Sequence, residues 1–272
     1  MDTLLLTAVL AERWLLAFLV DLARYVVGAG LVSLVLFGVF GRFSSRHRIQ
    51  ARRATRDDIR REVMHSVKTV MVYATVALVT IALIDRGAMR LYMDPGQYGW
   101  LYLTLTVPLL LILHDAYFYW VHRLMHHPRI FQRVHRLHHL SRTPTTWAAY
   151  SFSVWEAFAM TIFVPVVMAV MPIHPVALFV FLSIMIIRNA MGHSGVEFHP
   201  IGWVDSPLDA LTTVTHHDLH HQKFHGNYGL YFTWWDRWMG TELPGYKAAF
   251  RRAATPAEAV PSTHEATEAG GR

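Results

Sequence analysis

The histidines of this chain are the residues whose type and spacing point most directly to chemistry. Of the 18 histidines among the 272 residues, seven lie in residues 114–139 and seven in residues 193–225. Neutral imidazole offers a lone pair near pH 7, which makes histidine the commonest metal ligand. Histidines gathered in two short windows therefore predict a metal centre.

The spacing of these histidines fits the faces of helices. His122 and His126 are four residues apart, and each window also contains an HxxHH triplet. Residues three and four apart share one face of a helix, so we expect each triplet to direct its imidazoles at one point. With His193 added, the candidate metal ligands are His122, His126, His135, His138, His139, His193, His217, His220 and His221.

The number of candidates indicates more than one metal ion. A tetrahedral zinc site needs about four ligands, so this set is enough for two ions. Sites made only of nitrogen ligands suit zinc, copper, iron or nickel, and ligand type alone does not choose among them. The absence of cysteine excludes disulfides, iron–sulfur clusters and thiolate chemistry.

Long apolar runs must position these histidines. Hydrophobic residues make up 53% of the chain and charged residues 16%. We expect an all-α integral membrane protein with four to five spans, at residues 14–40, 65–84, 100–120, 150–171 and 176–187, the last two forming a hairpin. Asp21 and Arg24 interrupt the first span at i, i+3, where a tolerated ion pair is favoured over a functional role.

Charge predicts the orientation of the spans. The formal net charge of +6 lies in loops between apolar runs, and residues 41–62 are the most basic segment. The positive-inside rule places that segment in the cytoplasm and explains the charge better than nucleic-acid binding does. Counting spans from there puts both histidine windows on the cytoplasmic side, as a helical, histidine-rich cap that holds two metal ions.

Three sequence segments carry a family resemblance. HDAYFYWVHRLMHH, HRLHH and HHDLHHQKFHGNYG resemble the histidine boxes of the fatty acid hydroxylase / sterol desaturase superfamily. The GNY and WWD…GTE elements resemble C-4 methylsterol oxidases most closely. The resemblance covers roughly residues 100–245, within an expected catalytic domain (99–250). It does not cover the expected N-terminal spans with the basic loop (1–98) or the tail (251–272), whose composition predicts disorder.

The resemblance also implies a reaction. Members of this superfamily are membrane di-iron oxygenases that hydroxylate, oxidise or desaturate sterol or fatty-acyl lipids. They use O2 and electrons from an external donor of the ferredoxin, cytochrome b5 or reductase type. The nine candidate histidines correspond to the iron ligands of the family. Some members have a further histidine four residues before the match to His193, where this chain has Asn189.

Several polar residues are candidates for a supporting role. Ligating imidazoles usually donate their other N–H to a carboxylate or carbonyl, so Asp115, Asp218, Asp236 and Asn189 are candidates to orient them. For each aspartate, helix capping or ion pairing is an equal alternative.

A few histidines beside the boxes stay open as ligands, namely His114, His127 and His216. Of the neighbours His126 and His127, helix geometry favours His126. It lies about 40° around the axis from His122, against about 140° for His127. Pro128 also disfavours helical geometry at His127.

Two other functions remain as alternatives. A membrane metal-binding or metal-transport protein would place ligands within the spans, whereas these lie at the ends of spans. A haem protein needs one or two axial histidines and leaves the triplets unexplained. Within the oxygenase prediction, the sequence leaves open the lipid and the choice between hydroxylation and desaturation.

Overall fold

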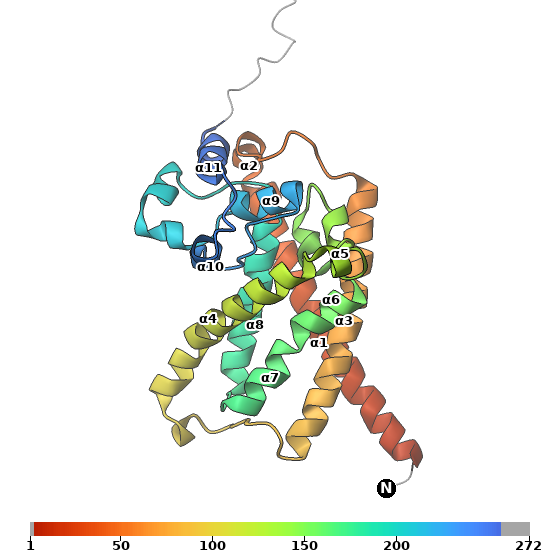
Figure 1. The fold of residues 1–272 in the computed structure, drawn as a ribbon. Helices are drawn as coiled ribbons and strands as arrows, with labels where there is room; N and C mark the ends of the chain where they lie inside the picture. Colours follow the sequence, from red (N-terminus) through yellow and green to blue (C-terminus); the bar gives the residue numbers. More distant parts are fainter. Residues whose placement is uncertain (1–2, 257–272) are drawn as a thin grey trace, which may run out of the picture.

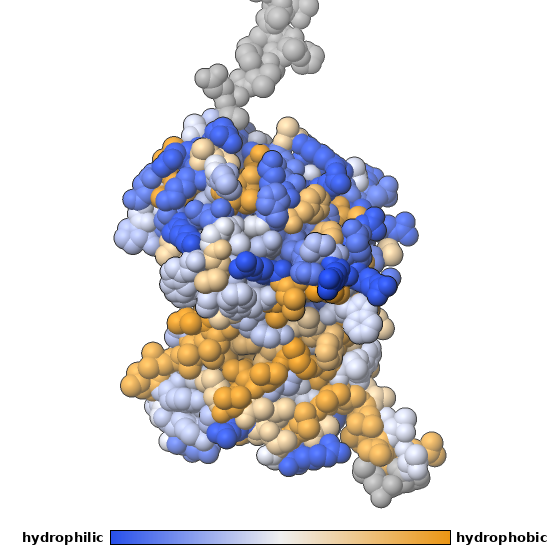
Figure 2. Space-filling model, viewed as in Figure 1, coloured by the Kyte–Doolittle hydropathy of each residue, from blue (hydrophilic) through white to orange (hydrophobic). Residues whose placement is uncertain are grey.

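The fold is a bundle of apolar helices that carries a polar helical cap at one end. The computed structural model describes residues 3–256, and the regular structure in this range is helical apart from isolated β-bridges. Four helices are long and apolar enough to cross a membrane: α1 (Thr3–Ser33) with its π-helical continuation η1 (Leu34–Val39), α3 (Arg56–Asp85), α4 (Trp100–Met125) and α8 (Pro175–Gly192). The protein is therefore a multi-pass integral membrane protein, and Figure 2 shows its apolar band.

The fifth predicted span is a broken helix. Residues 154–170 form α6 (Val154–Thr161) and α7 (Phe163–Val170), which are apolar but together shorter than the four spans. This segment runs back along the bundle, and α8 returns to the cap end (Figure 1). The predicted hairpin is thus present, with a break at Ile162.

Short helices form the cap and the connections. The cap elements are α2 (Gly41–Arg46), α5 (Pro128–Val134), η3 (His138–Leu140), η4 (Thr146–Tyr150), η5 (Ile201–Asp205), η6 (Pro207–Ala210), α9 (Val214–Lys223), α10 (Trp234–Trp238) and α11 (Tyr246–Ala254). The turn η2 (Pro95–Gln97) lies in the connection between α3 and α4, at the opposite end of the bundle (Figure 1).

Local capping makes some helices longer than the apolar pattern predicts. We predicted the second span from residue 65, but α3 begins at Arg56. Thr55 and Asp58 form a capping box in which each side chain accepts a hydrogen bond from the other's backbone N–H, at 3.1 and 3.0 Å. The predicted start of the first span at residue 14 was also late, because α1 begins at Thr3.

The N-terminal helices and the histidine-rich part share one hydrophobic core. Tyr25 of α1 is buried with Tyr150 and Ile186, and its hydroxyl donates to the Trp147 carbonyl at 2.8 Å. Gly28 lets α1 approach α8 closely, since a Cβ there would lie 3.0 Å from Ile186. The N-terminal spans therefore pack directly on the elements that carry the histidines.

The predicted C-terminal tail begins inside a helix. α11 continues to Ala254, and Tyr246 and Phe250 are buried against Val204. α11 therefore extends past residue 251, the predicted start of the tail, and this amphipathic helix docks on the cap. The rest of the predicted tail, from residue 257, lies outside the described residues.

Candidate metal centre

The nine candidate histidines converge as two groups. The first, which we call group A, contains His122, His126, His135, His139 and His220. The second, group B, contains His138, His193, His217 and His221. Within each group, the potential ligand nitrogens lie within 4.8 Å of one another, and eight of the nine residues are buried.

Each HxxHH triplet is divided between the two groups, which corrects the prediction that a triplet aims at one point. The first and last histidines of a triplet go to one group and the middle one to the other. On α9, His217 and His221 lie about 40° apart around the axis, whereas His220 lies about 100° from His221. In the earlier triplet, His135 ends α5 and a 3-10 turn carries the rest, so that segment is not one continuous helix.

Backbone carbonyls fix the orientation of several of these rings. The Nδ1 atoms of His122 and His220 lie 2.9 and 2.7 Å from the carbonyl oxygens of Tyr228 and Gly226. A carbonyl oxygen only accepts, so Nδ1 carries the proton and Nε2 of the neutral ring carries the lone pair. The GNY element thus positions these two of the five rings of group A.

Backbone carbonyls also fix the tautomers of two histidines in group B. His193 Nδ1 donates to the Asn189 carbonyl at 2.8 Å, and His138 Nδ1 donates to the Ser151 carbonyl at 3.4 Å. Their Nε2 atoms lie 3.3 Å apart, which brings two lone pairs together without a hydrogen between them. A cation between them relieves this repulsion, so the residues present fit a metal ion with nitrogen ligands.

Burial keeps the imidazoles neutral. Burial, and then the neighbouring histidines, lowers the pKa of His220 and His221 well below the usual value of 6.5. Burial lowers the pKa of His193 to about 4. Because a metal ligand must be unprotonated, these directions suit the site to metal binding near neutral pH.

Glu156 is a contact that the sequence prediction missed. Its Oε1 lies 2.7 Å from Nδ1 of His135, and both side chains are buried. Ser153 caps α6 and places Glu156 one turn into it. The sequence held a signal, because Glu156 is the one charged residue in the apolar stretch 143–187. An isolated carboxylate there needs a buried partner.

The four predicted supporting residues act differently from one another. Asn189 contacts His193, but through its backbone carbonyl, while its side chain donates to Ala149 at 2.7 Å. Asp236 accepts from the backbone N–H groups of Tyr228 and Gly229 at 2.9 and 2.8 Å. It therefore holds the turn whose Tyr228 carbonyl orients His122.

Among the described residues, the carboxylates of the other two aspartates form no hydrogen bond with a histidine of either group. Asp115 accepts from the N–H groups of Tyr231, Phe232 and the Trp234 indole. Asp218 accepts from Gln50 and Gln222. Backbone, indole and amide donors thus occupy these carboxylates, and their role in orienting the imidazoles stays a prediction.

The three open histidines lie outside both groups. His114 Nδ1 pairs with the Tyr231 hydroxyl at 3.0 Å. His127 is exposed and caps α5, its Nδ1 accepting from the Arg129 N–H at 3.3 Å. His216 lies 3.5 Å from Asp236. The structure thus brings His126, not His127, to His122.

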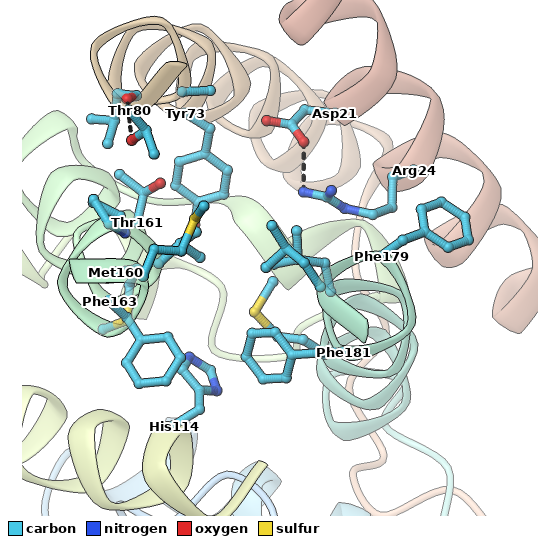
Figure 3. A pocket seen from close by; sticks show the side chains of 18 of the residues that line it. Asp21, Arg24, Tyr73, Thr80, His114, Met160, Thr161, Phe163, Phe179 and Phe181 are labelled. Carbon is cyan, nitrogen blue, oxygen red and sulfur yellow. Dashed lines mark hydrogen bonds and ion pairs between the residues drawn. The ribbon is translucent and has the colours of Figure 1, made fainter. Parts of the chain in front are cut away.

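An apolar cavity lies beside the histidines within the helical bundle. Its volume is about 420 Å³, within the range of roughly 300–1,000 Å³ for small-molecule sites. Phe118 and Phe152 line it, and their rings lie 5.1 and 5.2 Å from those of His122 and His138. Figure 3 shows the cavity with His114 on one side and the Asp21–Arg24 pair on the other.

Together these features define a class of protein: an integral membrane protein with a buried, histidine-rich centre fit for metal, next to an apolar cavity. Residues 107–241 match the model of the fatty acid hydroxylase family. The chain belongs to the fatty acid hydroxylase / sterol desaturase superfamily. No solved structure matches it significantly.

Curated relatives include enzymes named for sterol oxidation. The chain is 30% identical over 220 residues to Delta(7)-sterol 5(6)-desaturase ERG3B of Gibberella zeae, covering 80% of this chain and 64% of the relative. It is 31% identical over 192 residues to lathosterol oxidase of Mus musculus, covering 68% and 62%. It is 33% identical over 141 residues to cholesterol 25-hydroxylase of Rattus norvegicus, covering 48% and 44%.

The chain spans 64% and 62% of the length of the first two relatives. The predicted superfamily is confirmed, whereas the closer resemblance to C-4 methylsterol oxidases stays a prediction.

Proposed function

We propose that this protein is a di-iron oxygenase that hydroxylates or desaturates a membrane lipid of the sterol or fatty-acyl type. The observation that carries the proposal is the position of two buried groups of neutral histidines against an apolar cavity within the bundle. The names of the curated relatives support an oxidised lipid as the product.

The chain's own residues divide the work. The nine histidines would hold two iron ions, and backbone carbonyls and Glu156 keep their lone pairs directed inward. Iron bound there would supply the oxidising power, from O2 and external electrons, that attack on an unactivated C–H bond requires. Phe118 and Phe152 line the cavity beside His122 and His138, where their rings would keep water from the reacting lipid.

Lipid analysis tests the oxygenase proposal directly. The full-length chain and its His220→Ala variant are expressed in a sterol-fed bacterium, and membrane lipids are compared by mass spectrometry. We expect the wild type to yield a lipid that has gained one oxygen or lost two hydrogens, and the variant to lack that product. Identical lipid profiles for the two proteins, at equal amounts in the membrane, would refute the proposal.

We also propose that the histidine centre faces the cytoplasm. Eight arginines lie in residues 42–61, next to the cap end, whereas the α3–α4 connection at the other end has Arg86 and Arg90 offset by Asp85 and Asp94. An external electron donor of the ferredoxin, cytochrome b5 or reductase type would reach the centre from that side.

A topology reporter checks this orientation. A reporter fused after residue 256, beyond α11, is expected to be active in its cytoplasmic form and inactive in its exported form. The same reporter inserted at Gly96, in the α3–α4 connection, is expected to give the opposite result. Export of the reporter at residue 256 would contradict the proposed orientation.

A further inference from the structure

The wall of the apolar cavity contains a buried ion pair. Asp21 Oδ1 and an Arg24 guanidinium nitrogen lie 2.6 Å apart on α1, with side-chain exposures of 14% and 12%. Both residues line the cavity, and Figure 3 shows the pair at its edge. Two charges in an apolar cavity carry a desolvation cost, which good geometry and further hydrogen bonds offset.

The Tyr150 hydroxyl adds a third polar group to this part of the wall. Among the described residues, Arg24 Nε and the Tyr150 hydroxyl are buried without a hydrogen bond. Tyr150 lies beside the Arg24 guanidinium and also lines the cavity, so its hydroxyl and the ion pair form one polar patch in the apolar wall. In an otherwise apolar cavity a small number of polar groups fixes the orientation of a bound ligand, so this patch is the place where a polar group of the ligand would bind.

We propose that Asp21, Arg24 and Tyr150 form a binding site for a neutral hydroxyl group of the lipid. The proposal rests on the proposed function in taking this cavity as the substrate site. A hydroxyl both accepts and donates, so it can accept from Arg24 Nε and donate to the Tyr150 or Asp21 oxygen. The carboxylate of a fatty acid would instead add an uncompensated negative charge beside Asp21, which burial makes costly. The site therefore favours a lipid alcohol of the sterol type.

The position of this site orients the bound lipid. The Tyr150 ring lies 6.3 Å from that of Phe152, and Phe152 lies 5.2 Å from His138. The cavity continues away from the histidines to Leu91 and Pro175, at the end of the bundle opposite the cap. A lipid with its hydroxyl at Tyr150 therefore presents its hydroxyl end, rather than its distant tail, to the histidine groups.

Binding without turnover tests the site. The full-length protein, as purified and without a reductant, is placed in nanodiscs with radiolabelled lathosterol. Displacement is measured with unlabelled lathosterol, with the same sterol lacking its hydroxyl, and with palmitate. Because a hydrogen bond to a charged group contributes about tenfold or more to affinity, we expect lathosterol to bind at least about tenfold more tightly than either competitor.

Variants assign that preference to the site. Tyr150→Phe keeps the ring and removes the hydroxyl, and we expect it to reduce the preference over the deoxy sterol to about threefold or less. Asp21→Asn combined with Arg24→Gln should do the same. Tyr102→Phe is the matched control, because its hydroxyl bonds the Pro172 carbonyl outside the cavity, and it should keep the full preference.

Several outcomes would overturn the assignment. These are equal binding of the two sterols by the wild type, palmitate binding as tight as lathosterol, or an unchanged preference in Tyr150→Phe. Absence of lathosterol binding also counts against it. Because the assay contains no turnover, a failure to oxidise lipid with the binding preference intact counts against the oxygenase proposal alone.

Discussion

Alanine in place of His138 or His220 is expected to abolish lipid oxidation without preventing membrane insertion. His138 is one of four histidines in group B, and its loss leaves three nitrogen ligands. His220 belongs to group A, although it lies on α9 between His217 and His221 of group B in the sequence. We expect the wild type to bind about two irons, since about four ligands serve each ion. Each variant should lose at least one iron, with oxidation falling about 100-fold or more.

Metal analysis and product formation are measured on the same preparations. His225→Ala is the matched control, because His225 is exposed, follows the same helix and bonds only the Lys223 carbonyl among the described residues. It should keep both irons and most of the activity. Full oxidation by both His138→Ala and His220→Ala would show that these groups are not the reaction centre.

The neighbours His126 and His127 should respond oppositely to alanine. His126 Nε2 lies 3.1 Å from His139 Nε2 in group A. His127 points away and caps α5. We expect His126→Ala to lose metal and activity, by about 100-fold or more for the latter. His127→Ala should keep most of both and lower the free energy of unfolding by about 0.5–2 kcal/mol, as loss of a cap does.

Iron content, product and thermal unfolding distinguish the two variants. An inactive His127→Ala protein that melts like the wild type, alongside an active His126→Ala protein, would reverse the assignment. Such a result would mean that the end of α4 is arranged differently when metal is bound.

Much of the candidate site could be predicted from local spacing, because its ligands repeat at helical intervals. All nine predicted histidines converge, and His126 is preferred over His127 as helix geometry suggests. The division of each triplet was not predictable from spacing alone. It depends on two groups approaching α9 from different sides, which is a property of packing.

The orienting contacts were harder to predict than the histidines. Ser151, Gly226 and Tyr228 act through backbone carbonyls, which no side-chain motif encodes. We predicted an orienting role for the aspartates near the boxes. In the structure, Asp115 accepts a hydrogen bond from a backbone N–H group and Asp218 accepts one from the Gln50 side-chain amide. Glu156 could have been found from its isolation in an apolar stretch.

The fold was predictable in its spans and less so in its boundaries. Apolar length identified the four long helices, and the shorter α6–α7 segment accounts for the uncertainty between four and five spans. Helix starts depended on caps such as Thr55, which lie outside the apolar runs. The close approach of α1 to α8 at Gly28 is a long-range contact without a sequence signature.

The division of the triplets has a consequence for how the centre fills. His220 reaches one group while His217 and His221 reach the other, so a single helix, α9, is shared by both. A metal ion bound in either group would fix the rotation of α9 and of the η3 turn. Binding of the second ion would then cost less conformational entropy. Loading should therefore be positively cooperative, and thermodynamic linkage requires that emptying one group weakens the other equally. Half-loaded protein should be scarce, and a chelator titration should remove both ions in one steep step.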